Sequence, residues 1–245
     1  MEINKIWASH FFKKKVSFVS NGKTAISEAL KLLDSKVVAI PTYTCSRVYD
    51  ATINAKCKPI IVDCGLDLQI DINKIPDNVD TVIIPHMFGI QVDIKPIKNK
   101  FKIIEDCSQC MGLPNLGKYS DVVIASLGPT KWLPVGVDKE DGGGLIAYNK
   151  GNIENNFPWI EDAVSMFFEI KDRLKNRIEK ATEIKKSGVE LIGFERPNAW
   201  LRGMYFTEKQ TRVPYTPLHD LYNGFECPVV DSYKNKLDWV SIFAK

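Results

Sequence analysis

The sequence contains no long hydrophobic run and carries little net charge, and each absence excludes a class of protein. No stretch approaches the roughly 20 consecutive apolar residues of a membrane-spanning helix. The first residues also lack the apolar core of a secretory signal peptide. With 33 Lys and Arg against 30 Asp and Glu, the net charge of +3 is too small to indicate a nucleic-acid partner. We therefore expect a cytoplasmic protein that binds neither a membrane nor nucleic acid.

The six cysteines support neither a disulfide framework nor a zinc site. The chain has six cysteines and no secretory signal, so we expect reduced thiols. Cys107 and Cys110 form one C-x-x-C pair, which cannot supply the four ligands of a structural zinc ion. Repeats and low-complexity segments are absent as well. We interpret the cysteines as small buried thiols.

The composition is that of a globular protein, and its apolar runs predict an α/β fold. At 245 residues, with 44% hydrophobic and 26% charged residues, the chain can form one or two domains. Buried strands are predicted at 16–19, 37–40, 59–63, 81–85, 102–105 and 121–126, with one more at 143–148 that is either parallel or antiparallel. Amphipathic helices are predicted at 24–34 and 46–55. This alternation indicates a mostly parallel sheet covered on both faces.

The composition shifts near Lys150, and a different pattern follows. Apolar residues at helical spacing predict one long helix over 159–186, which Ser187-Gly188 ends as a helix C-cap. Short strands and turns punctuated by prolines follow. We therefore expect a large α/β domain at 1–150 and a small α+β domain at 151–245.

One lysine and three polar groups follow predicted strands, where open α/β sheets bind ligands. Lys131 lies in a turn after strand 121–126; partly desolvated, it could bond to an aldehyde such as pyridoxal phosphate (PLP), or it could be a solvated loop lysine. His86, Asp106 and Gln109 follow two other strands. Asp106 could also be a helix N-cap, and His86 a structural histidine. The turn at 20–24 is either a phosphate cradle or simply an N-cap.

Six short motifs in one order carry a resemblance to a known family. They are Ser20-Asn21-Gly22-Lys23-Thr24-Ala25-Ile26, Pro41-Thr42-Tyr43-Thr44-Cys45, Pro59-Ile60-Ile61-Val62-Asp63, His86-Met87-Phe88-Gly89-Ile90-Gln91-Val92-Asp93, Ile104-Glu105-Asp106-Cys107-Ser108-Gln109 and Ser126-Leu127-Gly128-Pro129-Thr130-Lys131. Together they resemble the DegT/DnrJ/EryC1/StrS family of PLP-dependent sugar aminotransferases. The resemblance implies the fold type I architecture: a mostly parallel, seven-stranded-type sheet with helices on both faces, plus a small C-terminal domain.

The resemblance also implies roles for individual residues. Lys131 would carry PLP and move a proton at the substrate carbon, and Asp106 would keep the pyridine nitrogen protonated. The remaining cofactor contacts implied by matching positions are Asn21, Gly22, Lys23, Cys45, Gln109 and Ser126. His86 and Tyr43 are weaker candidates for substrate contacts. No metal ligand is expected.

The resemblance further implies a reaction: an amino group, from glutamate by family analogy, passes to a nucleotide-linked keto sugar for surface polysaccharide or lipopolysaccharide. A homodimer with its sites at the interface is expected. The family's Asn-x-Arg-Met stretch, which reaches the partner's cofactor, has no counterpart here, so a degenerate, non-catalytic partner subunit is the alternative. A third possibility is another PLP reaction on an amino acid, for which Arg47, Arg196, Arg202 and Arg212 are candidate carboxylate ligands.

Overall fold

The computed structural model describes residues 12–135, 142–153, 160–208 and 216–242, with the backbone alone for 160–165. Nine strands are described: β1 (Lys15–Val19), β2 (Val37–Pro41), β3 (Lys58–Val62), β4 (Thr81–Pro85), β5 (Lys102–Asp106), β6 (Val122–Ser126), β7 (Gly144–Tyr148), β8 (Gly203–Phe206) and β9 (Leu237–Val240). The helices are α2 (Gly22–Leu32), α3 (Ser46–Asn54), α4 (Ile160–Lys186), α5 (Leu218–Leu221) and α6 (Pro228–Tyr233). Short 3-10 turns are η2 (Ile72–Lys74), η3 (Met87–Gly89), η4 (Lys95–Ile97) and η5 (Lys234–Lys236).

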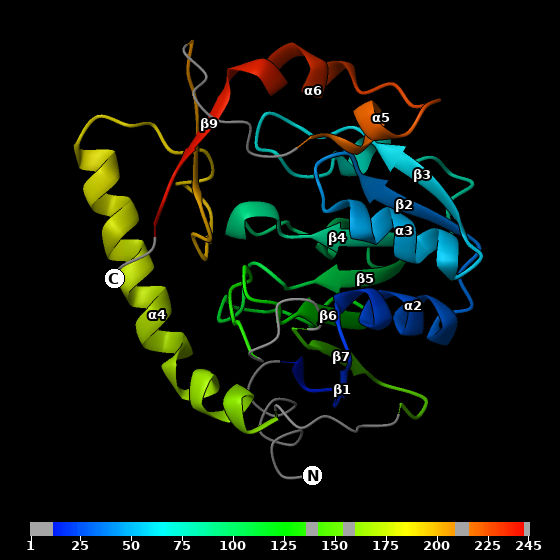
Figure 1. Cartoon of the computed structure of the whole chain (residues 1–245). Helices are drawn as coiled ribbons and strands as arrows, with labels where there is room; N and C mark the ends of the chain where they lie inside the picture. Colours follow the sequence, from blue (N-terminus) through cyan, green and yellow to red (C-terminus); the bar gives the residue numbers. More distant parts are fainter. Residues whose placement is uncertain (1–11, 136–141, 154–159, 209–215, 243–245) are drawn as a thin grey trace.

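The first seven strands form one sheet in the order β1-β7-β6-β5-β4-β2-β3, which runs in Figure 1 from β1 near the bottom to β3 near the top. The strands from β6 to β3 in this order are parallel, whereas β7 is antiparallel to both β1 and β6. The parallel strands therefore all end at the same edge, and α4 runs alongside that edge (Figure 1). This edge is where open α/β sheets bind their ligands.

Both faces of the sheet are covered because successive strand residues point to opposite sides. Ile83 and Ile104 belong to a core that packs against α2 and α3. Val82 and Ile103, one position earlier, belong to a second core closed by the segments around η2 and η4. On that same side, Ile170 of α4 belongs to a third core that also contains side chains of β1, β6 and β7. Near-continuous apolar strands are what a sheet buried on both faces requires.

The C-terminal residues pack beside β3, the outermost strand at one side of the sheet. The antiparallel pair β8–β9 forms a second, small sheet. Leu218, Val230 and Leu237 share the core that lies under α2 and α3. Two backbone N–H groups at the start of α6, those of Val229 and Val230, donate to the buried Asp63 carboxylate at the end of β3. The predicted division at residue 150 stays a prediction.

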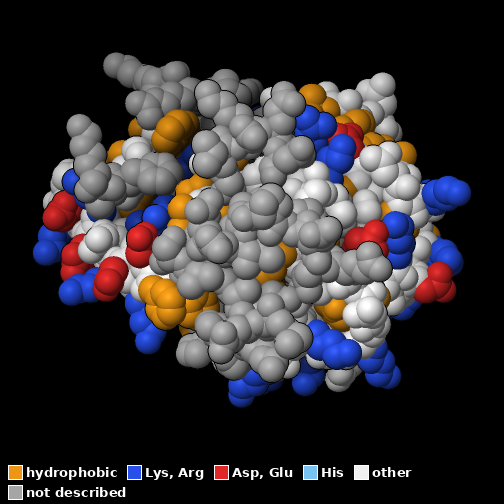
Figure 2. All heavy atoms as spheres, turned by 60° about the horizontal axis from the view of Figure 1, so that its bottom comes forward, with side chains coloured by type: hydrophobic (Ala, Val, Ile, Leu, Met, Phe, Trp, Pro, Cys, Tyr) orange, Lys and Arg blue, Asp and Glu red, His pale blue; other side chains and the backbone are white. Residues whose placement is uncertain are grey.

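The predicted fold class is confirmed, and each predicted strand and helix lies within two residues of the observed element. The strand at 143–148 is the antiparallel one. The long helix ends as predicted, with Gly188 at φ 94° and its N–H donating to the carbonyl of Lys185. None of the described helices is long and apolar enough to cross a membrane. On the side of the molecule that Figure 2 shows, basic side chains are spaced around the rim among acidic ones.

Candidate active site

A cavity of about 610 Å³ opens where the carboxyl ends of β5 and β6 meet the start of α2. Eight of the residues singled out from the sequence line it: Asn21, Gly22, Lys23, Cys45, Arg47, Asp106, Ser126 and Lys131. Ile26, Val48 and Ile124 give the cavity an apolar part. The other lining side chains are mainly polar or charged, so an apolar wall faces several convergent polar groups, as a cofactor with an apolar ring and a charged phosphate requires.

The first turn of α2 supplies backbone donors to this cavity. Asn21 caps the helix: its side chain accepts the N–H of Thr24 at 2.9 Å, and its carbonyl accepts that of Ala25 at 3.1 Å. The N–H groups of Gly22 and Lys23 come before these two, where a helix provides no internal acceptor. Because they also lie at the positive end of the helix dipole, they fit a phosphate group.

Gly22 lets α2 approach β6 unusually closely. A Cβ atom added at this position would lie 2.7 Å from Cβ of Ser126 and 3.2 Å from its Oγ. A larger residue would therefore push the helix away from the strand and fill the space beside the Ser126 hydroxyl. The close approach places both predicted phosphate contacts together, so the residues present fit the phosphate end of PLP.

Asp106 ends β5 with its side chain at the cavity, where it is 9% exposed. Its Oδ1 accepts hydrogen bonds from both the N–H and the hydroxyl of Ser108. Within the described part of the chain, Oδ2 accepts no hydrogen bond. This oxygen is therefore available to a donor in the cavity, as the ring nitrogen of PLP requires.

Lys131 lies in the turn after β6, half-buried, and it lines the same cavity as Asp106. Its own N–H donates to the carbonyl of Gly128 at 2.9 Å, which closes the turn. The next residue, Trp132, is fully buried and its Nε1 donates to the carbonyl of Ala199 at 3.0 Å. The buried tryptophan thereby fixes the turn that presents the lysine.

Gln109 lines a smaller adjoining hollow of about 20 Å³, together with Cys45, Asp106 and Lys131. Its Oε1 accepts the N–H of Phe88 at 2.7 Å. The amide group thus holds the segment after β4 against the segment after β5. Gln109 lies beside the candidate site, and the prediction that it touches the cofactor stays a prediction.

His86 lines the same hollow but has both ring nitrogens engaged within the protein. Nδ1 accepts the N–H of Val92 at 3.0 Å, so Nε2 carries the proton and donates to Glu105 Oε1 at 2.9 Å. Cys107 and Cys110 bring their sulfur atoms within 4.8 Å of this ring, and all three side chains are buried. Because the histidine already uses both nitrogens, this cluster is a structural contact and not a metal site.

Tyr43 lies outside the two cavities. It is 1% exposed, belongs to the core under α3 and stacks on Tyr233 with ring centroids 6.2 Å apart. The structure gives no support to Tyr43 as a substrate contact. Arg212, one of the candidate carboxylate ligands, lies outside the described residues.

The structure adds Ser108 to the site, and of the four arginines named as candidate carboxylate ligands it brings Arg47 to this cavity. The signal for Ser108 was available: an Asp-x-Ser spacing after a strand is typical of a side chain that bonds back to the aspartate. Arg47 is 68% exposed and begins the helix that follows β2 at the same edge of the sheet. Placing it in the cavity required the strand order, which the sequence does not contain.

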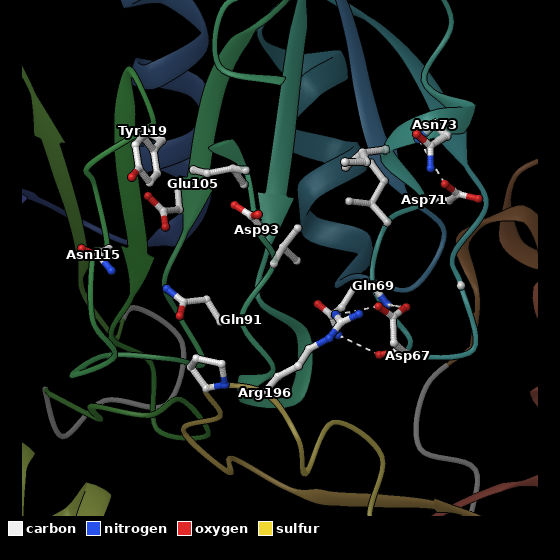
Figure 3. Close-up of a pocket in the computed structure, with 16 residues that line it drawn as sticks. Asp67, Gln69, Asp71, Asn73, Gln91, Asp93, Glu105, Asn115, Tyr119 and Arg196 are labelled. Carbon is white, nitrogen blue, oxygen red and sulfur yellow. Dashed lines mark hydrogen bonds and ion pairs between the residues drawn. The ribbon is translucent and has the colours of Figure 1, made fainter. Parts of the chain in front are cut away.

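Figure 3 shows a second cavity of about 610 Å³, on the face of the sheet away from α2 and α3. Four acidic residues line it, Asp67, Asp71, Asp93 and Glu105, and among the described lining residues there is one arginine, Arg196. Arg196 Nη1 lies 2.7 Å from Asp67 Oδ2. No residue lines both cavities. Because an acidic surface repels phosphate, the first cavity is the candidate active site.

Comparisons with known proteins identify the family of the chain. A model of the DegT/DnrJ/EryC1/StrS aminotransferase family matches residues 4–163. The chain is 29% identical over 151 residues to the 3-oxo-glucose-6-phosphate:glutamate aminotransferase of Bacillus subtilis (strain 168), a match covering 53% of this chain and 32% of that protein. The chain thus matches about a third of the length of this curated relative.

Solved structures share the fold. The crystal structure of NtdA from Bacillus subtilis with bound cofactor PMP has a TM-score of 0.65 and 21% identity, over 84% of this chain and 57% of that one. For 3-amino-5-hydroxybenzoic acid synthase the TM-score is 0.82 at 12% identity, over 98% of this chain and 84% of the other. The family and the fold class predicted from the sequence are thereby confirmed. The chain belongs to the DegT/DnrJ/EryC1/StrS aminotransferase family.

Proposed function

We propose that the chain is a PLP-dependent aminotransferase in which Lys131 and Asp106 are the central pair. The observation that carries the proposal is that both residues line one cavity with the first turn of α2. An amine, a carboxylate and a phosphate cradle are the three groups that PLP needs from a protein. They come from three separate segments of the chain, so the arrangement has no explanation in local structure.

The lining residues have distinct roles toward PLP. PLP, when bound, supplies an electron sink that makes the substrate carbon next to nitrogen acidic. Lys131 would be the nucleophile toward its aldehyde and the base that takes the proton from that carbon. Asp106 would hold a proton on the ring nitrogen, since a neighbouring carboxylate favours the charged form. The Gly22 and Lys23 amides would bind the phosphate.

The substrates that we propose are taken from the family and from the curated relative. That relative is described as using glutamate and 3-oxo-glucose-6-phosphate. We extend the donor, glutamate, and the acceptor class, a keto sugar, to this chain. The finer assignments are a nucleotide-linked keto sugar, a role in surface polysaccharide or lipopolysaccharide synthesis, a cytoplasmic location and a homodimer. A sugar phosphate belongs beside the nucleotide sugar among the acceptors to be tested.

A visible spectrum of the purified protein tests the cofactor assignment. We expect PLP to give the wild-type protein an absorption band that borohydride abolishes while fixing the cofactor to Lys131. Lys131→Ala should lose both the band and the fixation. Lys31→Ala is the matched control, because Lys31 lies on the outer surface of α2 with its side chain 64% exposed, and it should behave as wild type.

Two other outcomes separate the alternatives. A wild-type protein that takes up no PLP would contradict the proposal. A protein that binds PLP through Lys131 but exchanges no amino group with glutamate would instead indicate the non-catalytic partner role.

A further inference from the structure

A third cavity, of about 330 Å³, lies between the turn after β6 and the side of α4. Three basic residues line it, Lys131, Arg173 and Arg177, and among its described lining residues none is acidic. Lys131 also lines the proposed cofactor cavity, so the two spaces meet at the side chain that would carry PLP.

Arg177 is fixed in this cavity although it is a buried cation. Arg177 is 6% exposed, and its guanidinium carbon lies 4.9 Å from the ring centroid of Trp132. Its Nη1 donates to the carbonyl of Trp200 at 3.3 Å. Stacking on the indole and this hydrogen bond hold the planar group in one orientation. A preorganised guanidinium loses little freedom when it binds an oxyanion.

The surroundings of Arg177 disfavour its positive charge. Burial, followed by the nearby charge of Arg173, lowers the pKa of Arg177 from 12.5 to about 10. Arg173 bonds Glu169 through Nε and Nη2, which uses two of its five N–H donors. An anion bound beside Arg173 and Arg177 would counter the repulsion between their two charges.

The acidic cavity in Figure 3 provides the contrast within the same molecule. There, four carboxylates line the walls and Arg196, which pairs with Asp67, is the single arginine among the described lining residues. The arginine cavity has the opposite charge and lies beside Lys131. A negatively charged substrate that reacts at Lys131 would therefore be drawn to this side.

We propose that the cavity lined by Arg173 and Arg177 is the subsite for the anionic end of a substrate, a phosphate or a carboxylate group. The proposal rests on the proposed function, since it places the substrate beside Lys131. The planar guanidinium matches both kinds of oxyanion with paired hydrogen bonds, which an ammonium group cannot do. The source of the anion is either a phosphorylated keto-sugar acceptor or the dicarboxylate donor.

Two unreactive probes distinguish these sources. Glucose 6-phosphate carries a sugar phosphate without the keto group, and glutarate carries two carboxylates without an amino group. Binding is measured by isothermal titration calorimetry on PLP-loaded protein, because the cofactor then occupies the phosphate cradle of α2. The variants are Arg173→Gln and Arg177→Lys. The control is Arg196→Gln, which removes an arginine from the acidic cavity.

We expect both variants to weaken binding of at least one probe by about tenfold or more, the effect of losing a charged hydrogen bond. Weaker binding of glucose 6-phosphate alone assigns the subsite to the acceptor, and weaker binding of glutarate alone assigns it to the donor. Weakening of both indicates that donor and acceptor use it in turn. Unchanged binding of both probes in Arg173→Gln, or an equal loss in Arg196→Gln, would overturn the proposal.

Failure of this inference can be told apart from failure of the proposed function. The PLP absorption band of each variant is recorded before the titration, and it reports on Lys131 alone. If Arg177→Lys does not fold, Arg173→Gln still decides, because that side chain is one-third exposed on α4 and its loss leaves Trp132 covered. A wild-type protein that forms the band yet binds neither probe also contradicts the subsite while leaving the cofactor assignment intact.

Discussion

A single hydroxyl group, that of Ser108, connects the two strands that deliver the candidate catalytic residues. Its Oγ donates to Asp106 Oδ1 at the end of β5 and accepts the N–H of Ser126 at the end of β6, at 2.7 Å. The hydroxyl therefore orients the carboxylate and fixes its distance from the phosphate cradle at the same time. At the scale of single residues, Ser108 is a positioning residue for Asp106.

Ser108→Ala should lower the free energy of unfolding by about 1–2 kcal/mol, because it leaves the Ser126 N–H without its acceptor. It should also weaken PLP binding, since the carboxylate loses a donor that holds it in place. Urea unfolding of the apoprotein and PLP titration measure the two effects. Ser232→Ala, which removes an exposed hydroxyl from α6, is the control. Equal effects of the two substitutions would contradict this role.

Cys45 differs from the other five cysteines in its exposure. The five others are buried, whereas Cys45 is half-buried and lines the proposed cofactor cavity. We expect iodoacetamide to modify Cys45 first in the folded protein, and bound PLP to slow that reaction. Peptide mass spectrometry identifies the modified thiol, and Cys45→Ser should remove the fast phase. Modification at the same rate with and without PLP would place the cofactor elsewhere.

At the scale of secondary-structure elements, Glu105 ties the carboxyl ends of β4 and β5 to the loop beyond them. His86 donates to Oε1, while the Gly117 N–H and the Ser120 hydroxyl donate to Oε2 at 2.7 and 2.8 Å. Burial opposes the charge, but these hydrogen bonds outweigh it and hold the pKa of Glu105 below its ordinary value. The carboxylate thus stabilises the edge of the sheet on which Asp106 lies.

This pKa shift predicts a loss of stability in acid. In the folded protein the pKa of Glu105 lies below 4.5, the ordinary value, which applies to the unfolded chain. As the pH falls from 4.5 through the folded pKa, the unfolded chain therefore binds more protons than the folded protein. The contribution of Glu105 is therefore complete above about pH 4.5 and is lost below it. Glu105→Gln should cost about 2–3 kcal/mol at neutral pH, and the difference from wild type should shrink in acid.

Urea unfolding at several pH values measures this, with the exposed Glu195→Gln as the control. A difference that does not change between neutral and acid pH would show that the charge of Glu105 is not responsible.

The elements themselves were largely predictable because a sheet buried on both faces requires continuous apolar strands. The strand predicted at 81–85 has its observed bounds, whereas the direction of the strand at 143–148 depends on partners far away in sequence. Helix α2 begins two residues before its predicted start because Asn21, not a later residue, caps it. Apolar periodicity detects the buried face of a helix but not its first polar turn.

At the scale of the whole molecule, Asp63 joins the C-terminal part of the chain to the sheet. It is buried at the end of β3, and its Oδ2 accepts the Val229 N–H and the Lys74 ammonium, both at 2.9 Å. Its Oδ1 accepts the N–H of Val230 at 3.2 Å. A single carboxylate thus holds the start of α6 against the end of β3, the outermost strand of the sheet.

Asp63→Asn should destabilise the protein by about 2–3 kcal/mol, because an amide turns one acceptor into a donor that faces the N–H groups of α6. It should also expose the C-terminal part to proteolysis before the sheet unfolds. Limited trypsin digestion with mass spectrometry measures this against Asp77→Asn, a control at a side chain that is 93% exposed. If both variants are cleaved alike, Asp63 does not hold the two parts together.

The candidate site was only partly predictable from the sequence, because part of it depends on how the whole chain packs. Lys131 and Asp106 follow strands, and the ends of parallel strands meet at one edge whatever their order. Arg173 and Arg177 lie on a helix whose path past that edge depends on the packing of the entire chain. Sequence spacing places residues within an element, whereas the third cavity forms between elements.

The position of β1 affects how the protein forms during synthesis. Lys15, near the start of the chain, pairs with Tyr148 of β7, which itself completes the sheet beside β6. At about 5–20 residues per second, the ribosome needs on the order of ten seconds to make the intervening chain. During that time the newly made β1 has an open edge, so its apolar residues Val16, Phe18 and Val19 are natural sites for chaperone capture.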